Sequence, residues 1–516
     1  MKRAFTYLAT LLVLAGLSSC HDFLTENTGD LDYVRTVADL DELLVGDGYI
    51  RTEAVASVMG LVGSEQIGSW IHCMDDDVQV FRTRLSAVFS AWEWHYRFSK
   101  DPFIGCGSVS QLSALQEYED RTWNRLYKQI SIANLVIGQL DDRFRGDPRY
   151  NRIKGEALFL RGQALHYLVN CYAKPYTPST AATDPGIPLK LTAPIEDRDY
   201  RRNSVAEVYE RIVLDLAEAA ELMEGIENRS IYRAGPAAAH ALLSRTHLYM
   251  QRWDDAVREA DLVLRDARYG VYDLAALNAD KEGSDYQPAV WGGSPEVIFT
   301  QGPLYHMAFL QSFYVAPQEV YELFGEGDVR RKQFTEEWAF GSGPTTGWRL
   351  RYKYATDEGA GIVSNCLSIR LPEVVLNKAE ALAHRAEAGD EQLAAQLLAD
   401  LAARRLSAES PTGAPPTGAA LIDAIRLERR KELFQEGHRW FDLKRYAVQE
   451  DYPLRKAVAH KAWRLDNVEV YEGEFILPAY DPAAPGNWLL PIPRREIEIN
   501  HGAMTDNPRT TITATK

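Results

Sequence analysis

Beyond its first 20 residues, the 516-residue sequence lacks any apolar run long enough to cross a membrane. A spanning helix needs roughly 17–25 consecutive apolar residues. The one sustained run, at 4–17, is shorter and follows a positive start at Lys2 and Arg3. A positive start and a short apolar run that ends in small residues are typical of an export signal, not of a membrane span.

The export signal ends in Leu17-Ser18-Ser19-Cys20, which resembles a bacterial lipobox. The resemblance implies that a signal peptide, 1–19, is cleaved before Cys20 and that this cysteine is then acylated. Several acyl chains together hold a protein stably on a membrane, whereas one chain is marginal. The alternative is a soluble exported protein whose cysteine lies near the start by chance.

Cysteine is scarce elsewhere in the chain. Besides Cys20 there are only Cys73, Cys106, Cys171 and Cys366, and none of them forms a C-x-x-C pair. This spacing argues against a zinc knuckle and against a thioredoxin-like motif. Four cysteines allow three disulfide pairings, among which the sequence does not choose.

Positive charge is also in deficit. The chain has 57 Lys and Arg against 73 Asp and Glu, which gives a formal net charge of −16. Because nucleic acids and anionic lipid surfaces attract basic proteins, this balance argues against either of them as the partner.

Recognisable catalytic motifs are missing. The sequence contains neither H-E-x-x-H nor G-x-S-x-G, and the glycine-rich "GSGPTTG" at 341–347 has no lysine for a phosphate loop. The run Asp75-Asp76-Asp77 leaves three interpretations open: a solvated turn, which we favour, part of a cation site, or a glycosidase-like carboxylate pair. We expect no enzyme activity, no cofactor and no metal.

Helical periodicity is abundant. The segments 123–142 and 151–172 carry apolar stripes at three- and four-residue steps, and Ser204 with Glu207 forms a capping box. Small residues at Ser244, Ala256 and Ala260 have the spacing of a tetratricopeptide repeat, in which small side chains let paired helices approach closely. The segment 371–406 shows a weaker form of the same pattern.

Between the helical blocks the chain is rich in Gly, Pro, Tyr and Trp and has little periodicity. We therefore predict one mostly α domain at 20–516, with a tetratricopeptide-like helix-pair scaffold, a large irregular loop-rich ligand-binding region and a few short strands, such as "EVIFTQ" and "WRLRYKY". The scaffold lies mainly at 117–269 and 370–446, and the loop-rich regions are 50–116, 270–370 and 452–516.

One segment has a recognisable signature. "LIDAIRLERRKELFQEGHRWFDLKRY" at 421–446 closely resembles the C-terminal signature of the SusD/RagB family of outer-membrane nutrient-binding lipoproteins. "GEALFLRGQALHYLVNCYAKPY", "GIPLKL", "SVAEVYERIVLDL", "LSIRLPEVVLNKAEALA" and "LLPIPRREIEIN" match other family segments in the family's order. The resemblance covers nearly the whole chain, and it implies the helix-pair fold and no catalysis.

The resemblance also implies a location and a partner. The protein would be lipid-anchored on the outward face of a bacterial outer membrane, over a SusC-like TonB-dependent barrel transporter. It would capture oligosaccharides or peptides and deliver them to that transporter. Two alternatives stay open: a helical-repeat lipoprotein scaffold that binds only protein partners, and an exported hydrolase.

The C-terminal signature has a physical interpretation of its own. Glu436, Arg439, Asp442 and Arg445 stand three apart with alternating sign, so on one helix they can form a ladder of ion pairs, each worth roughly 0.2–0.5 kcal/mol when exposed. We favour an architectural role, in which this helix closes the solenoid; the alternative is a charged contact with the transporter. Gly437 would then lie in a helix interior, where glycine is unfavourable, so close packing against it is expected.

Aromatic side chains outside the helical stripes are the candidate ligand contacts. A flat ring can take the C–H face of a sugar or pack against a peptide side chain, while nearby polar groups bond to the ligand. Core packing is the alternative at each position. The candidates are Trp70, Trp92, Trp94, Tyr96, Tyr286, Trp291 and Tyr305.

Overall fold

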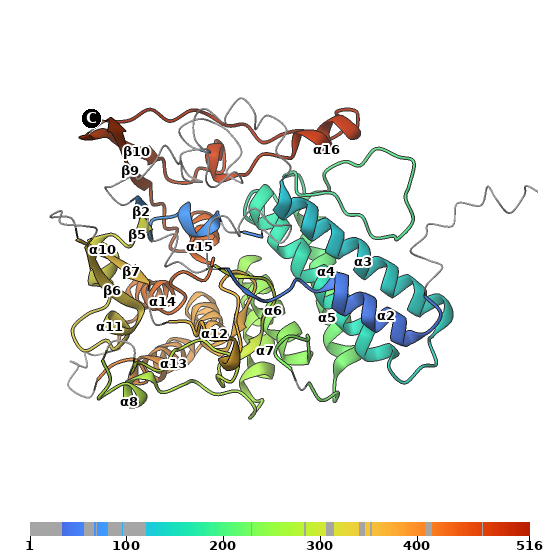
Figure 1. Cartoon of the computed structure of the whole chain (residues 1–516), viewed down its shortest axis with the longest axis horizontal. Helices are drawn as coiled ribbons and strands as arrows, with labels where there is room; N and C mark the ends of the chain where they lie inside the picture. The colour runs from blue at the N-terminus through green and yellow to red at the C-terminus, as the bar shows by residue number, and fades with distance from the viewer. Residues whose placement is uncertain are drawn as a thin grey trace, which may run out of the picture.

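The computed structural model describes residues 34–55, 67–68, 70–80, 95, 120–228, 230–282, 285–305, 314–339, 346–350, 353–407, 415–466 and 468–515. Helices dominate these segments and the strands are few and short, so the predicted mostly α fold is confirmed (Figure 1). Cys20 lies outside the described residues, as do Trp92, Trp94, Tyr96 and Cys106.

The scaffold consists of helices that pack on their neighbours in the chain. Figure 1 shows α3, α4 and α5 side by side at one end and α12, α13 and α14 at the other, with α6 and α7 between them. The bounds are α2 (Val37–Leu43), α3 (Arg121–Arg143), α4 (Tyr150–Tyr172), α5 (Val205–Met223), α6 (Pro236–Tyr249), α7 (Trp253–Leu264), α12 (Leu371–Arg385), α13 (Asp390–Ala403), α14 (Ala419–Glu432) and α15 (Arg439–Tyr446).

Local sequence signals explain where these helices begin and how they pack. Ser204 caps α5 with a full capping box to Glu207, as predicted. In α6, the Ser244 hydroxyl donates a hydrogen bond of 3.0 Å to the carbonyl oxygen of Ala256 on α7, and both residues are fully buried. The small residues thus allow the close approach that the repeat-like spacing predicts.

Shorter elements form the rest of the described chain. The helical ones are the π-helical turn η1 (Leu44–Gly48), η3 (Ile71–Cys73), α8 (Leu274–Leu277), α10 (Gln318–Leu323), α11 (Arg330–Phe334), η8 (Glu358–Ala360), η9 (Gly486–Trp488) and α16 (Arg494–Ile499). The strands are β1 (Ala54–Val55), β2 (Gln79–Val80), β3 (Val297–Phe299), β4 (Leu304–Tyr305), β5 (Tyr314–Val315), β6 (Thr335–Ala339), β7 (Thr346–Leu350), β8 (Ile369–Arg370), β9 (Val458–Asp466) and β10 (Val468–Leu477).

The strands pair only two at a time within the described segments. β1 and β4 are parallel, whereas β2–β5, β3–β8, β6–β7 and β9–β10 are antiparallel. The longest pair, β9–β10, shifts register between Tyr471 and Gly473, and the latter has a φ of +133°. Some of these strand pairs connect distant parts of the chain, because β2 pairs with β5 and β3 pairs with β8.

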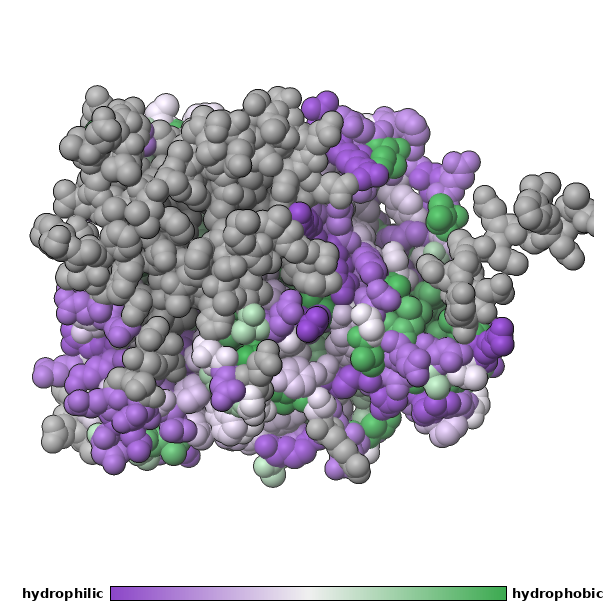
Figure 2. Space-filling view, in the orientation of Figure 1, coloured by the Kyte–Doolittle hydropathy of each residue, from purple (hydrophilic) through white to green (hydrophobic). Residues whose placement is uncertain are grey.

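Two apolar clusters hold the fold together. The larger runs through the helical scaffold and includes the 67–78 segment and the C-terminal Trp488. The smaller lies among the short elements, around Phe324, Phe334 and Phe434. On the face shown in Figure 2 the described surface is largely hydrophilic, and its apolar residues occur in small groups.

The C-terminal signature differs from its prediction. It forms two helices, α14 and α15, because the intervening Gln435 and Gly437 have positive φ angles of 62° and 76°. The expectation of one continuous helix with exposed ion pairs was therefore wrong. Gly437 is not in a helix interior; its conformation favours glycine.

Candidate ligand-binding region

The structure places two of the predicted aromatic residues in the interior. Trp70 is 4% exposed and Tyr305 is 2% exposed. The Tyr305 hydroxyl donates to the carbonyl oxygen of Ile67 at 2.8 Å and accepts from its N–H at 2.9 Å. The His72 and Tyr305 ring centroids lie 6.3 Å apart. These contacts fasten the 67–80 segment to β4, and the role of the two rings as ligand contacts stays a prediction.

Tyr286 and Trp291 lie on a separate loop before β3, and both are partly buried. The Trp291 ring covers Gly293, where an added Cβ would meet that ring at 2.3 Å. The loop is fastened by backbone hydrogen bonds between Val290 and the strand-like segment at Lys353 and Ala355. Trp291 thus keeps part of its surface in solvent on a well-anchored loop, and its contact with a ligand also stays a prediction.

A third aromatic site was missed by the sequence reasoning. Tyr321 of α10 and Trp348 of β7 stack face to face, with centroids 3.4 Å apart and planes 4° apart. The Arg331 guanidinium lies over the Tyr321 ring at 4.4 Å, and the Trp348 indole N–H donates to the exposed Gln318 side chain at 2.8 Å. We call these four residues the aromatic platform.

The platform can make contacts suited to a polar ligand with apolar faces. Trp348 and Tyr321 are both partly exposed. Because Tyr321 covers one face of Trp348, the exposed part of the indole is its other face or its edge. The Gln318 amide stands at the edge of the indole, and its NH2 group can donate to hydroxyl or carbonyl oxygens. The Arg331 guanidinium lies on the face of Tyr321 that Trp348 does not cover.

A buried network of ion pairs supports the elements around this region. Glu432 of α14 accepts hydrogen bonds from Arg405 (2.9 Å), Arg330 (3.0 Å) and Arg370 (3.2 Å). Glu296, just before β3, pairs with Arg405 at 2.6 Å and with Arg370 at 2.7 Å. All five of these side chains are at most 1% exposed. We call this set the Glu432 network.

Electrostatics keeps the Glu432 network ionised despite its burial. Burial opposes the charged form of Glu432, but Arg405, Arg370 and Arg330 together hold its pKa well below its usual range. Lys353 extends the network, because its ammonium lies 2.6 Å from Glu436 and donates to two backbone carbonyls. Burial lowers the pKa of Lys353 to about 8, against the opposing effect of Glu436.

The run Asp75-Asp76-Asp77 is buried, so the expectation of a solvated turn was wrong. Asp76 pairs with Arg439 at 2.7 Å, with Lys456 at 2.6 Å and with Arg430 at 3.1 Å. Asp77 also pairs with Arg430, at 2.7 Å. Carboxylate oxygens of the three aspartates lie within 4.8 Å of one another. The cations pair with Asp76 and Asp77, whereas burial and these two neighbouring carboxylates raise the pKa of Asp75 well above its usual range. The ion pairs make the cluster a clamp between the 70–80 segment and the C-terminal signature.

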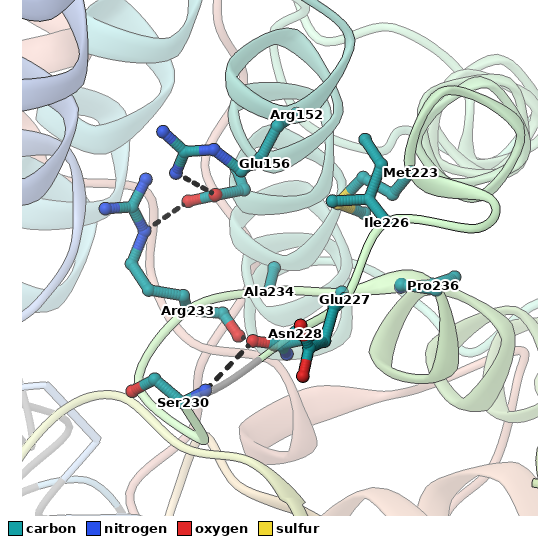
Figure 3. Close-up of a pocket in the computed structure, with 11 residues that line it drawn as sticks. Arg152, Glu156, Met223, Ile226, Glu227, Asn228, Ser230, Arg233, Ala234 and Pro236 are labelled. Carbon is teal, nitrogen blue, oxygen red and sulfur yellow. Dashed lines mark hydrogen bonds and ion pairs between the residues drawn. The ribbon is translucent and has the colours of Figure 1, made fainter. Parts of the chain in front are cut away.

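A hollow of about 200 Å³ lies between α4 and the α5–α6 connection (Figure 3). On one wall Glu156 pairs with Arg152 at 3.1 Å and with Arg233 at 2.5 Å, and Asp41 pairs with the same two arginines. Met223 and Ile226 form the apolar wall. A second hollow of about 360 Å³ shares Ile226, Glu227 and Pro236 with the first.

These two hollows do not suit a sugar chain. Small-molecule sites usually measure about 300–1,000 Å³ and are rich in aromatic side chains. The first hollow is smaller and its charges are paired, and neither hollow is lined by Trp or Tyr.

Among the described helices, none has the length and apolarity that crossing a lipid bilayer requires.

Two models of known protein families match the sequence of this chain. A family model described as "Starch-binding associating with outer membrane" matches residues 78–248, and a model described as "SusD family" matches residues 305–509. Together these matches take in well over half of the chain. Among the curated proteins, none matches it.

Solved structures show the same fold. A SusD superfamily protein from Bacteroides thetaiotaomicron is 23% identical, with a TM-score of 0.68, over 92% of this chain and 100% of that one. A SusD-like carbohydrate binding protein from Bacteroides vulgatus is 20% identical, with a TM-score of 0.65, over 92% of this chain and 98% of the other. The fold, the C-terminal signature and both family matches agree, and the chain belongs to the SusD family.

Proposed function

We propose that the protein is a lipid-anchored, cell-surface nutrient-binding protein that captures oligosaccharides and delivers them to a partner TonB-dependent transporter in the outer membrane. The observation that carries the binding part is the aromatic platform, a partly exposed Trp348–Tyr321 stack with Gln318 at its edge and Arg331 over the Tyr321 ring.

The platform supports a sugar ligand for a physical reason. A pyranose ring presents apolar C–H groups that lie well on an aromatic plane, while its equatorial hydroxyls point outward to polar partners. Trp348 offers a partly exposed aromatic surface, and the Gln318 amide at its edge offers donors. The Glu432 network stiffens the elements behind it, so little ordering is needed on binding, which favours affinity.

The relatives support oligosaccharide over peptide as the ligand class. The family model over 78–248 is described as starch-binding, and the Bacteroides vulgatus protein as carbohydrate binding. Binding of the chain without residues 1–20 to a glycan array and to a peptide library tests this assignment. We expect glycan hits and no peptide hits; hits on peptides alone would move the proposal to peptide uptake.

The same arrays separate the proposal from its rivals. A lipoprotein scaffold for protein partners would bind neither array. An exported hydrolase would shorten its glycan, which product analysis after prolonged incubation would detect. The proposed function requires glycan binding and an unchanged glycan length.

Anchoring is proposed from the sequence around Cys20 and from the family model described as associating with the outer membrane. A chain that carries labelled acyl groups and fractionates with outer membranes supports it, and Cys20→Ala should remove both properties. Co-purification of a barrel transporter with the anchored protein tests the partner. If Cys20→Ala keeps the label and the membrane fraction, the anchor lies elsewhere.

A further inference from the structure

A second group of aromatic rings lies on the helical scaffold, in residues that the aromatic platform does not use. Trp253 at the start of α7 stacks on His384 of α12, with centroids 4.6 Å apart and planes 10° apart. The Tyr452 ring, from the loop after α15, lies 6.2 Å from His384. Tyr452 is 46% exposed and Trp253 is partly exposed. We call these three residues the scaffold aromatic cluster.

Backbone contacts hold this cluster in place. Tyr452 has a φ of +55°, which is costly for a residue with a bulky side chain, and its carbonyl accepts a 2.7 Å hydrogen bond from Arg426. Gln251 also has a positive φ, of 59°, and its side chain accepts from the N–H of Glu450 at 3.1 Å. Strained backbone persists only where its surroundings fix it, so the loop that carries Tyr452 is firmly placed.

His384 is an unusual buried group within the cluster. It is 7% exposed, and neither ring nitrogen has a hydrogen-bond partner in the part of the chain that the structure describes. Buried polar groups are nearly always paired, so an unpaired imidazole calls for an explanation. Both nitrogens are also shielded from solvent, so a ligand hydroxyl would reach them only after Trp253 or Tyr452 moved aside.

Charged residues directly follow two members of the cluster in the chain. Asp254 follows Trp253 and is 79% exposed, and Arg385 follows His384 and pairs with Asp254 at 2.9 Å and with Asp390 at 2.7 Å. A carboxylate and a guanidinium beside aromatic faces are the groups that bond to adjacent sugar hydroxyls. The cluster therefore repeats the chemistry of the aromatic platform with different residues.

We propose that the scaffold aromatic cluster is a second carbohydrate-binding site, where a sugar ring packs on Tyr452 and Trp253 and bonds to Asp254 and Arg385. The ligand class rests on the proposed function. The site is an open surface, so alone it binds weakly; with the platform engaged on the same polymer, the second contact becomes intramolecular and strengthens retention of long chains.

Affinity gel electrophoresis tests the site. The chain without residues 1–20 runs through gels containing amylopectin, xylan, mannan or inulin, beside Tyr452→Ala, Trp348→Ala and Tyr471→Ala. Tyr471 is the matched control, because it is 45% exposed but lies on β10. On the polymer that retards the parent, we expect Tyr452→Ala to raise the dissociation constant at least threefold, Tyr452→Phe to restore it, and Tyr471→Ala to leave it unchanged.

The outcomes separate this inference from the proposed function. A parent retarded by a polymer, with Tyr452→Ala retarded equally, overturns the second site and leaves the proposed function standing. Loss of retardation in Tyr471→Ala as well overturns it too, because the effect is then not specific. A parent that no glycan in the gels or on the array retains overturns the proposed function itself, and the second site with it.

Discussion

Neutralising Glu432 should destabilise the fold far more than neutralising an exposed carboxylate. In the structure this fully buried side chain faces three guanidinium groups, those of Arg405, Arg330 and Arg370. Glu432→Gln keeps the size and shape of the side chain but removes its charge. It also turns an acceptor into an amide whose NH2 group must face an arginine donor.

The magnitude follows from the arrangement. Removing one partner from a buried ion pair typically costs about 3–5 kcal/mol, because the remaining charge is left in a poorly solvated interior. Arg405 keeps Glu296, and Arg370 keeps Glu296 and Glu436. Because the arginines keep other carboxylate partners, we expect Glu432→Gln to lower the free energy of unfolding by about 3–5 kcal/mol in total, and not by that amount for each ion pair.

Urea unfolding followed by tryptophan fluorescence measures this loss. The matched control is Glu498→Gln on α16, because Glu498 pairs with Arg494 at 2.6 Å four residues earlier, with side chains 59% and 85% exposed. Exposed helical pairs contribute about 0.3–0.5 kcal/mol. We expect the midpoint of Glu432→Gln to fall well below the parent's and that of Glu498→Gln to change little. Equal, small shifts in both variants would refute the role given to the network.

Substitutions elsewhere in the fold should also change its stability. Gly437→Ala should lower the free energy of unfolding by about 1 kcal/mol, because Gly437 has a φ of +76°. Gly138→Ala should raise it by about 0.5–1 kcal/mol, because Gly138 lies within α3 and has open space around its Cβ position. Urea midpoints of the two variants that move in the same direction would contradict this expectation. Burial lowers the pKa of His166 to about 3, and Arg245 adds to this effect. Between pH 3 and 6.5 the unfolded chain therefore binds one more proton than the folded chain, so the free energy of unfolding falls as pH falls through that range. His166→Gln should reduce this slope by about 1.4 kcal/mol per pH unit, and an unchanged slope would contradict the expectation. Asp76→Asn should lower the free energy of unfolding by about 2–4 kcal/mol, because Arg439 and Lys456 lose their carboxylate partner while Arg430 keeps Asp77. Lys456→Gln removes the most exposed of the three cations and should cost less; the reverse order of urea midpoints would contradict the clamp.

The helical scaffold could be predicted because its signals are local. The capping box at Ser204 and Glu207 and the small residues at Ser244 and Ala256 act within one helix or one helix pair, and the structure confirms both. Helix periodicity needs only a short window of sequence to be visible.

The buried ion pairs could not be predicted in the same way. Charges three residues apart in the C-terminal signature suggested an exposed ladder, and only the Asp442–Arg445 pair forms as the spacing indicates. Glu436 instead pairs with Arg370, which is 66 positions away, and Arg439 with Asp76, which is 363 positions away. Such partners are brought together by tertiary packing, so they cannot be predicted from the spacing of charges along the chain.

The candidate site was only partly accessible from the sequence. Aromatic composition drew attention to loops that contain Trp70 and Tyr305, yet in the structure these rings are buried. Trp348 was visible only as part of a possible strand, and Tyr321 lay in the segment 270–370, which was predicted to be loop-rich. Their stacking depends on how β7 lies against α10. Exposure of a ring is a property of the fold, so composition alone could not rank these residues.

Isothermal titration of the leaderless chain with the oligosaccharide that binds best on the array tests whether the aromatic platform holds the sugar. We expect saturable binding by the parent and by Tyr471→Ala, and an affinity at least tenfold weaker for Trp348→Ala, which corresponds to about 1.4 kcal/mol. Full affinity in a correctly folded Trp348→Ala protein would contradict the assignment of the aromatic platform as the place where the sugar binds.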